Sequence, residues 1–289
     1  MQAIMSIDVE EWFHIPEGLD NILPFNKWDK AVQRVQYVLP KMLDIFEKNS
    51  VTATFFFLGW IAKKHPALVQ ETIRRGHEIA SHGYAHKLIY NQTQFEFEED
   101  IYKAKSILEN ITGQQINGYR APGFSIIPET EWAFDILAKN GIKYDSSVFP
   151  AKRFYGHYDK FNKEPTLVTT DNGDIIEFPQ TLVDFGLFRL SCFGGGYLRL
   201  FPKSFFLLMS EWIEKKNRPL IIYIHPRDID ILQPKIHFSP LKRFRHYINI
   251  SKTEHKLFDI TERFKFTSFE NVISDPAFLT SIGSTKVST

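Results

Sequence analysis

The residues of this sequence best suited to chemistry are two histidines, His82 and His86, in the segment Ser81–His86. Four residues is about one helical turn, the interval at which two side chains lie on one face and can reach the same ion. Neutral imidazole is the commonest protein ligand for a transition metal. The pair therefore indicates a metal site, and the alternative is a pair of surface or capping histidines.

Three acidic residues, Asp8, Glu10 and Glu11, follow a short apolar segment at the start of the chain. In an extended chain Asp8 and Glu10 share a face, whereas Glu11 points the other way. Carboxylates at the carboxyl ends of parallel strands face the edge where sites form. One carboxylate from Asp8 or Glu10, added to His82 and His86, would complete a set suited to Zn²⁺ or another divalent metal. A solvated turn, or a cap for the next segment, is the alternative.

Two further residues could act beside such a metal. Arg120 lies in the turn-rich segment Gly118–Phe124, where its guanidinium could orient a carboxylate base, or could form a structural ion pair. His225 ends an apolar segment and precedes a proline, which suits either a general acid with a pKa near neutrality or a core histidine. A metal-activated water with an acid and a base is the chemistry of amide or ester hydrolysis.

Other reactive residue types are better explained structurally. Ser191 and Cys192 have no base beside them in the sequence, so neither is favoured as a nucleophile. The run Gly194–Gly196 lacks the Lys-Ser/Thr of a phosphate-binding loop and indicates a tight loop. With a single cysteine, the chain cannot form an internal disulfide, which suits a reducing compartment.

The elements that must position these residues alternate between strands and helices. Buried strands are predicted at 3–9, 52–58, 78–81, 142–144, 175–179 and 219–225. Helices are predicted at 28–49 (interrupted by Pro40), 66–75, 93–112, 128–140, 202–216 and 254–264. Such alternation predicts an α/β fold with a largely parallel, barrel-like sheet. We expect one domain over 1–270, with a C-terminal extension from about 231, and a flexible tail over 271–289 rich in Ser and Thr.

Composition excludes several classes of function. The formal net charge is +1, so no overall field attracts nucleic acid or an anionic membrane. A local basic cluster, Lys242, Arg243, Arg245 and His246, is interpreted as a solvated helix face. The first residues run directly into a strand without the features of a signal peptide, and no apolar run is long enough to span a bilayer. We therefore expect a cytoplasmic protein without a transmembrane segment.

Taken in order, these pieces resemble the NodB-type polysaccharide deacetylases, carbohydrate esterase family 4. The family's motifs are an acidic first motif, a Ser-His-x-x-x-His metal motif, an Arg-x-Pro loop and a late histidine after an apolar strand. Finer details resemble the branch found in exopolysaccharide and exosortase-linked gene clusters. The segments that carry this likeness are Ser6–His14, Tyr144–Pro150, Gly194–Arg199, His225-Pro226 and Phe244–Tyr247.

The resemblance implies a distorted (β/α) barrel and a role for each matched residue. It implies Asp8 as the general base, His82 and His86 as metal ligands, Arg120 as the residue that orients the base, and His225 as the general acid. The family usually has two adjacent aspartates where this chain has Asp8-Val9-Glu10. Period-two geometry favours Glu10 as the third ligand, while Asp8 and Glu11 stay open as alternatives. The family's acidic motif between the Arg loop and the late histidine is only partly present, as Asp145-Ser146-Ser147.

The sequence therefore predicts a Zn²⁺-dependent hydrolase that removes an N-acetyl group from an amino sugar of a glycan, or of a lipid- or nucleotide-linked precursor. One alternative is an O-acetyl esterase or another N-acyl hydrolase on the same scaffold. The other is a non-catalytic sugar-binding relative with a degenerate metal site. Trp12, Phe13, Phe124 and Tyr197 are candidates for stacking on sugar rings, although aromatic residues are more often part of a core.

Overall fold

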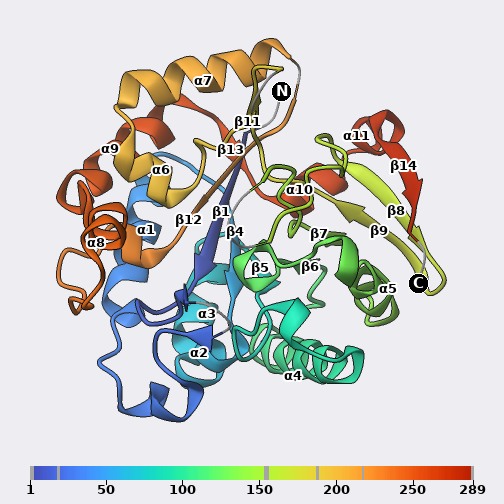
Figure 1. The fold of residues 1–289 in the computed structure, drawn as a ribbon, viewed down its shortest axis with the longest axis horizontal. Coiled ribbons are helices and arrows are strands. Elements are labelled where there is room, and N and C mark those ends of the chain that lie inside the picture. The colour runs from blue at the N-terminus through green and yellow to red at the C-terminus, as the bar shows by residue number, and fades with distance from the viewer. Residues whose placement is uncertain (1–2, 18–19, 153–155, 187–188, 217, 288–289) are drawn as a thin grey trace.

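The computed structural model describes residues 3–17, 20–152, 156–186, 189–216 and 218–287. Within these ranges ten strands form one sheet in the order β12-β1-β4-β5-β6-β7-β9-β8-β14, and β13 pairs with β1 (Figure 1). Its strands are β1 (Ala3–Val9), β4 (Thr54–Phe57), β5 (Glu78–Ser81), β6 (Gly118–Tyr119), β7 (Tyr144–Asp145), β8 (Thr166–Thr170), β9 (Gly173–Glu177), β12 (Leu220–Ile224), β13 (Phe266–Thr267) and β14 (Gly283–Lys286). Two small hairpins are separate from it, β2 (Pro16–Glu17) with β3 (Asp20–Asn21) and β10 (Val183–Asp184) with β11 (Arg189–Leu190).

Helices connect and cover these strands. They are α1 (Val35–Lys48), α2 (Gly59–Lys64), α3 (Pro66–Arg74), α4 (Gln94–Thr112), α5 (Trp132–Lys139), α6 (Gly195–Leu200), α7 (Lys203–Lys215), α8 (Pro240–Tyr247), α9 (Ile250–Arg263), α10 (Phe269–Ile273) and α11 (Pro276–Ser281). The sequence anticipated α3, α4, α5, α7 and α9 to within a few residues. The first predicted helix is shorter than expected, because 25–30 form a separate 3₁₀ turn and α1 begins only at Val35.

The strands from β12 to β9 run parallel, so their carboxyl ends meet at one edge of the sheet. Only β8 is antiparallel to its neighbour β9, and β14 then pairs parallel to β8. The predicted α/β class is confirmed. The strand order is consistent with a distorted (β/α) barrel, although no pairing closes β12 onto β14 in the described ranges.

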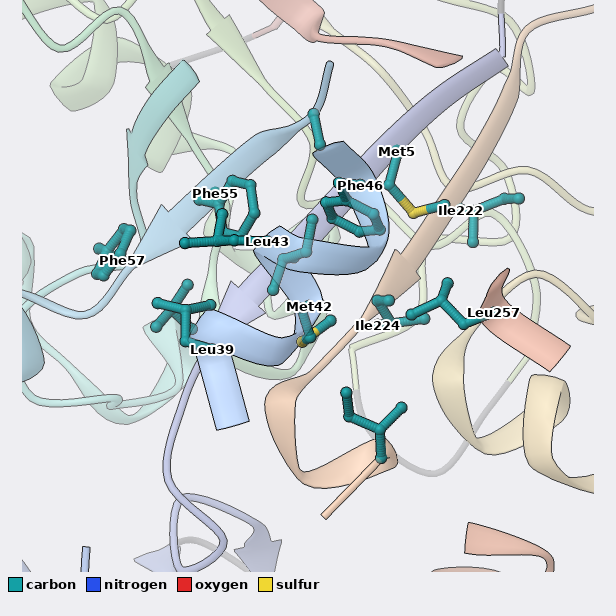
Figure 2. Close-up of a cluster of buried hydrophobic side chains, with 14 of the residues drawn as sticks. Met5, Leu39, Met42, Leu43, Phe46, Phe55, Phe57, Ile222, Ile224 and Leu257 are labelled. Atoms are coloured by element: carbon teal, nitrogen blue, oxygen red, sulfur yellow. The ribbon is translucent and has the colours of Figure 1, made fainter. Parts of the chain in front are cut away.

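The two faces of β1 have different surroundings, and this alternation sets up the site. Met5 and its odd-numbered neighbours face α1, whose apolar side covers β1, β4 and β12 (Figure 2). The even-numbered side faces the inside of the curved sheet, where Ile4 packs with Phe56 and Ile221. Because side chains alternate along a strand, Asp8 points to the inside as well, and Glu10 follows it.

The C-terminal residues differ from the flexible tail expected over 271–289. Helix α11 lies there, and β14 adds a strand to the sheet by pairing Gly283–Lys286 with β8. Earlier in the same half, β13 pairs with β1, which ties the segment after 231 into the central sheet. Edge pairing explains why a Ser/Thr-rich sequence is ordered here, since main-chain hydrogen bonds need no apolar side chains. In the described part of the chain, no helix has the length and apolar character needed to cross a bilayer.

Candidate metal and catalytic site

Glu10 and the two histidines converge at the carboxyl edge of the sheet. Oε1 of Glu10 lies 3.0 Å from Nε2 of His82 and 2.9 Å from Nε2 of His86, and all three side chains are buried. Asp8 and His225 lie beside them, with Nε2 of His225 3.8 Å from Oδ2 of Asp8 and 3.8 Å from Oε1 of Glu10. The structure thus brings together the acids and histidines that the sequence singled out.

The donor atoms of this cluster fit a cation. Nδ1 of His82 lies 2.7 Å from the main-chain oxygen of Arg120, which can only accept a hydrogen bond. A neutral His82 therefore carries its proton on Nδ1 and presents the lone pair of Nε2 to Oε1 of Glu10. Two lone pairs 3.0 Å apart need a proton or a metal ion between them. Two imidazoles and one carboxylate are a ligand set that zinc and related divalent ions accept.

A loop, and not a helical turn, places the two histidines. His82 directly follows β5, and the chain then takes left-handed backbone angles at Gly83 (φ 72°) and His86 (φ 50°). The carboxylate of Asp100 on α4 accepts the N–H groups of Tyr84 (2.7 Å) and of the residue after it (3.1 Å). A Cβ on Gly83 would lie 2.7 Å from Oδ2 of Asp100, so glycine is required there. The spacing of four was informative, but its helical explanation was wrong.

Asp8 is held by Arg120. Nη1 of Arg120 donates to Oδ1 of Asp8 at 2.7 Å and to Oγ of Ser6 at 2.9 Å, and the guanidinium is fully buried. Its Nε and Nη2 donate to the main-chain oxygen and to Oγ of Ser146, each at 3.1 Å. The guanidinium leaves Oδ2 of Asp8 directed toward His225, as an orienting residue should.

The Asp145-Ser146-Ser147 segment supports this arginine loop rather than His225. Oγ of Ser147 accepts the N–H of Ala121 at 2.7 Å, and Oδ1 of Asp145 accepts the hydroxyl of Ser147 at 2.5 Å. Asp145 also lies against Glu177, and burial raises the pKa of both carboxyls. The partial acidic motif, on β7, thus has a structural task five strands along the sheet from β12, which the late histidine follows.

His225 instead receives its support from a residue that the sequence reasoning missed, Asp228. Oδ2 of Asp228 lies 3.2 Å from Nδ1 of His225 and accepts the main-chain N–H of His225 at 2.8 Å. The other carboxylate oxygen forms an ion pair with the buried guanidinium of Arg199 on α6. The signal was present three residues after the histidine, in His225-Pro226-Arg227-Asp228.

The Gly194–Gly196 run makes room for this support. A Cβ on Gly195 would lie 1.7 Å from Oδ2 of Asp228, and one on Gly194 would lie 2.3 Å from the ring of Tyr223. The prediction of a tight loop was wrong, because Gly195 and Gly196 begin helix α6 and Gly194 precedes it. Glycines are needed because a carboxylate and an aromatic ring approach the main chain.

Burial and neighbouring charges shift the pKa values of the site residues away from their ordinary values. Burial alone would raise the pKa of Glu10, but His86 and Arg227 hold it well below its usual range. Arg227, also missed by sequence reasoning, donates from Nη1 to Oε2 of Glu10 and leaves Oε1 to the histidines. Burial and the charge of Arg227 lower the pKa of His225 to about 3, so the expectation of a value near neutrality was wrong.

Glu11 lies outside the cluster. Its carboxylate accepts the main-chain N–H groups of Arg34 (2.7 Å) and Val35 (2.9 Å) at the start of α1. Burial raises the pKa of Glu11 to about 7. Among the described residues, the groups of convergent donor atoms contain Glu10 or Asp8 but not Glu11. Geometry therefore favours Glu10 as the third ligand.

The remaining sequence candidates are mostly core residues. Phe13 and Phe124 are buried, while Trp12 and Tyr197 are partly exposed, so only the latter pair is accessible to a sugar. Cys192 is buried, and its burial raises the thiol pKa to about 12, as suits a structural residue. His14, buried within the first motif, stacks on His86 with ring centroids 5.5 Å apart.

Two family models match the chain, one after the other. The model described as polysaccharide deacetylase matches residues 27–144, and a domain of unknown function (DUF3473) matches residues 146–274. The first contains His82, His86 and Arg120, and the second contains His225 and Asp228.

Curated relatives match part of the chain. A Bacillus cereus peptidoglycan-N-acetylglucosamine deacetylase is 34% identical over 119 residues, which are 37% of this chain and 43% of the relative. A Helicobacter pylori peptidoglycan deacetylase is 29% identical over 110 residues, which are 38% of this chain and 36% of the relative. The chain thus matches less than half the length of these relatives.

The fold is also found in a solved structure. A Mycobacterium smegmatis crystal structure assigned to the polysaccharide deacetylases superposes with a TM-score of 0.68 at 15% sequence identity. The superposition covers 100% of this chain and 93% of the other, which establishes the likeness of fold over the whole chain. A polysaccharide deacetylase model thus matches part of the chain, and the likeness of fold extends over its whole length.

Proposed function

We propose that this chain belongs to the NodB-type polysaccharide deacetylases and is a metal-dependent hydrolase that removes the N-acetyl group from an amino sugar. The observation that carries the proposal is the meeting of Glu10, His82 and His86 beside an Arg120-held Asp8 and an Asp228-held His225. A degenerate sugar-binding relative would not need all five groups in hydrogen-bonding or ion-pairing distance.

Glu10, His82 and His86 would hold one divalent cation, and Zn²⁺ suits two imidazoles with one carboxylate. When bound, such an ion polarises the acetyl carbonyl and lowers the pKa of a water molecule toward neutrality. Arg227 keeps the second oxygen of Glu10 engaged, so that Glu10 offers the ion a single oxygen. The hydrogen bond from Nδ1 of His82 to the main-chain oxygen of Arg120 fixes the histidine tautomer that metal binding requires.

The proton transfers are assigned to Asp8 and His225. Oδ2 of Asp8 takes a proton from water as the water oxygen bonds to the acetyl carbon. Asp228 holds the proton of neutral His225 on Nδ1, so Nε2 is free to receive one from Asp8, 3.8 Å away. Nε2 then gives it to the departing sugar nitrogen as the C–N bond breaks, which yields acetate and a free amine.

The substrate is proposed as an N-acetylated amino sugar because the curated relatives are named for deacetylation of peptidoglycan sugars. Trp12 and Tyr197 offer the partly exposed aromatic surface for its rings. The finer assignment, to exopolysaccharide synthesis with a lipid- or nucleotide-linked precursor in the cytoplasm, belongs to the same proposal.

Acetate release from paired substrates tests the proposal. Zinc-loaded protein should release acetate from N-acetylglucosamine oligomers, chelation should abolish release, and added Zn²⁺ should restore it. Asp8→Asn should lower the rate about 10²- to 10⁴-fold, the range for a lost general base. Preferential release from O-acetylated sugars would instead support the esterase alternative. An inactive protein that still binds the oligomers would support the sugar-binding alternative.

A further inference from the structure

The segment 231–250 differs in charge from the rest of the molecule. It carries Lys235, Lys242, Arg243 and Arg245 and no Asp or Glu, whereas the whole chain has a formal net charge of +1. Helix α8 lies within it and has no buried residue. In the described ranges Lys235, Arg243 and Arg245 form no ion pair with an acidic side chain. These three residues therefore present positive charge to the surroundings of the segment.

Large apolar side chains are exposed among these cations. The exposed fractions are 66% for Ile231, 68% for Leu232, 59% for Leu241 and 54% for Phe244. Leu241 and Phe244 are three residues apart on α8 and so lie on the same side of the helix. Solvated basic helices do not need such residues, which makes the interpretation of a merely solvated face incomplete.

Contacts join the two parts of the segment into one surface. The main-chain N–H of Ile236 donates to the hydroxyl of Tyr247 at 2.8 Å, which ties the loop before α8 to the end of the helix. Ile231, Lys235 and Arg243 line one hollow, and Arg243 and Phe244 line the next. We call the following set the basic-apolar face: Ile231, Leu232, Lys235, Leu241, Lys242, Arg243, Phe244 and Arg245.

The face is attached to the catalytic end of the molecule. Nη2 of Arg199 donates to the main-chain oxygen of Arg245 at 3.2 Å, and the same guanidinium pairs with Asp228, which holds His225. In Figure 1, α8 lies at the periphery of the molecule beside α6 and α9. Whatever binds the face therefore lies near the carboxyl edge of the sheet.

We propose that the basic-apolar face docks on an anionic lipid bilayer. Cations attract a negatively charged surface, and alkyl and aromatic side chains between them enter the boundary between headgroups and acyl chains. Four exposed apolar residues favour a bilayer over a purely anionic polymer, which offers charge without an apolar layer. Docking goes beyond the proposed hydrolysis and would bring the site to substrates carried at a membrane surface.

Cosedimentation with vesicles tests the docking without using the reaction, so its failure is separate from failure of the proposed function. The protein should bind vesicles containing phosphatidylglycerol and should bind phosphatidylcholine vesicles much more weakly. R243Q/R245Q should weaken binding roughly fivefold for each cation removed. L241S/F244S should weaken binding to the same vesicles and at high salt should abolish it.

Matched controls remove the same groups elsewhere. K41Q/K48Q on α1 and F95S/L208S on α4 and α7 remove exposed cations and exposed apolar residues far along the chain from α8. Both controls should bind as the parent does, with circular dichroism showing that all variants are folded. The proposal is overturned if the parent does not bind anionic vesicles, if a control loses as much binding as the variants of the face, or if L241S/F244S binds anionic vesicles as well as the parent does.

Discussion

Two buried glutamates at opposite ends of the same sheet have opposite ionisation. Glu10 lies at the carboxyl edge, where His86 and Arg227 hold its pKa well below the usual range although burial alone would raise it. Glu78 begins β5 at the amino end and is equally enclosed, but burial raises its pKa to about 7. Its carboxylate accepts the hydroxyls of Thr54 and Tyr144, both at 2.5 Å.

The difference teaches that burial does not by itself decide the charge of a carboxyl. The guanidinium of Arg227 and the neighbouring histidines stabilise the charged form of Glu10, which can serve as a ligand. Burial raises the pKa of Glu78 to about 7, because the neutral hydroxyls and the main-chain N–H of Glu270 that donate to it offset only part of the cost of burying its charge. At the carboxyl edge Glu10 is thus part of the candidate site, whereas at the amino end Glu78 has a structural role and joins β4, β5, β7 and α10.

The largest difference between the two ends is expected when each glutamate is replaced by glutamine. E10Q removes the anionic ligand, and we expect loss of bound Zn²⁺ and a fall in deacetylase rate of at least about 10³-fold. E78Q makes the same chemical change at the amino end and should keep both metal and rate. Metal analysis and acetate release measure the two effects. Equal metal content in the two variants would show that Glu10 is not a ligand.

A smaller loss is expected from D228N, which leaves the ligands in place. Without the anionic partner, Nδ1 of His225 loses the contact that fixes its tautomer, and kcat should fall about 10- to 100-fold with metal retained. D230N is the matched control, because Asp230 is also buried and pairs with Arg34 at 2.9 Å but does not touch His225. Equal losses in kcat for the two variants would assign the effect to the fold of the segment.

The third effect is on stability and not on activity, and it lies at the amino end of the sheet. The folded-state pKa of Glu78, about 7, is above the ordinary 4.5, so the folded protein binds this proton more tightly than the unfolded chain. The stabilisation is fully present below pH 4.5 and is lost as pH rises through about 7. The whole difference corresponds to about 3 kcal/mol.

Urea unfolding at pH 4 and pH 8 measures this difference. Relative to the parent, E78Q should gain about 3 kcal/mol of unfolding free energy between the two pH values, because its amide does not titrate. The exposed E99Q on α4 should stay within about 0.5 kcal/mol of the parent at both. Parallel pH dependence of the parent and E78Q would contradict a raised pKa at this position.

The fold class and much of the site were predictable from local patterns. The alternation of apolar strands and amphipathic helices predicted the parallel sheet, and placement of Asp8 and Glu10 on one face followed from β1 alone. His82 and His225 were found because each directly follows a predicted strand, and Arg120 because it lies in a turn-rich segment; the structure places Arg120 directly after β6. These inferences needed only the period of the backbone.

Other features depended on contacts between distant segments and were missed or misjudged. The Ser- and Thr-rich composition predicted a flexible tail. In the structure β14 pairs with β8 through main-chain groups, which leave no pattern in the sequence. The pKa of His225 follows from burial and from Arg227, neither of which is a property of the histidine. The contact of the Asp145-Ser146-Ser147 segment with the Arg120 loop also depends on strand order, because β7 pairs with β6.

By itself the sequence determined which residue types reach the carboxyl edge, since strand period and chain direction are local properties. Only the tertiary structure decided what each does there. It turned Glu11 to the start of α1 and Glu10 to the histidines, and it supplied Asp228 as the partner of His225. The physical reason is that ionisation and hydrogen bonding depend on distances between segments, and those distances arise only when the sheet has assembled.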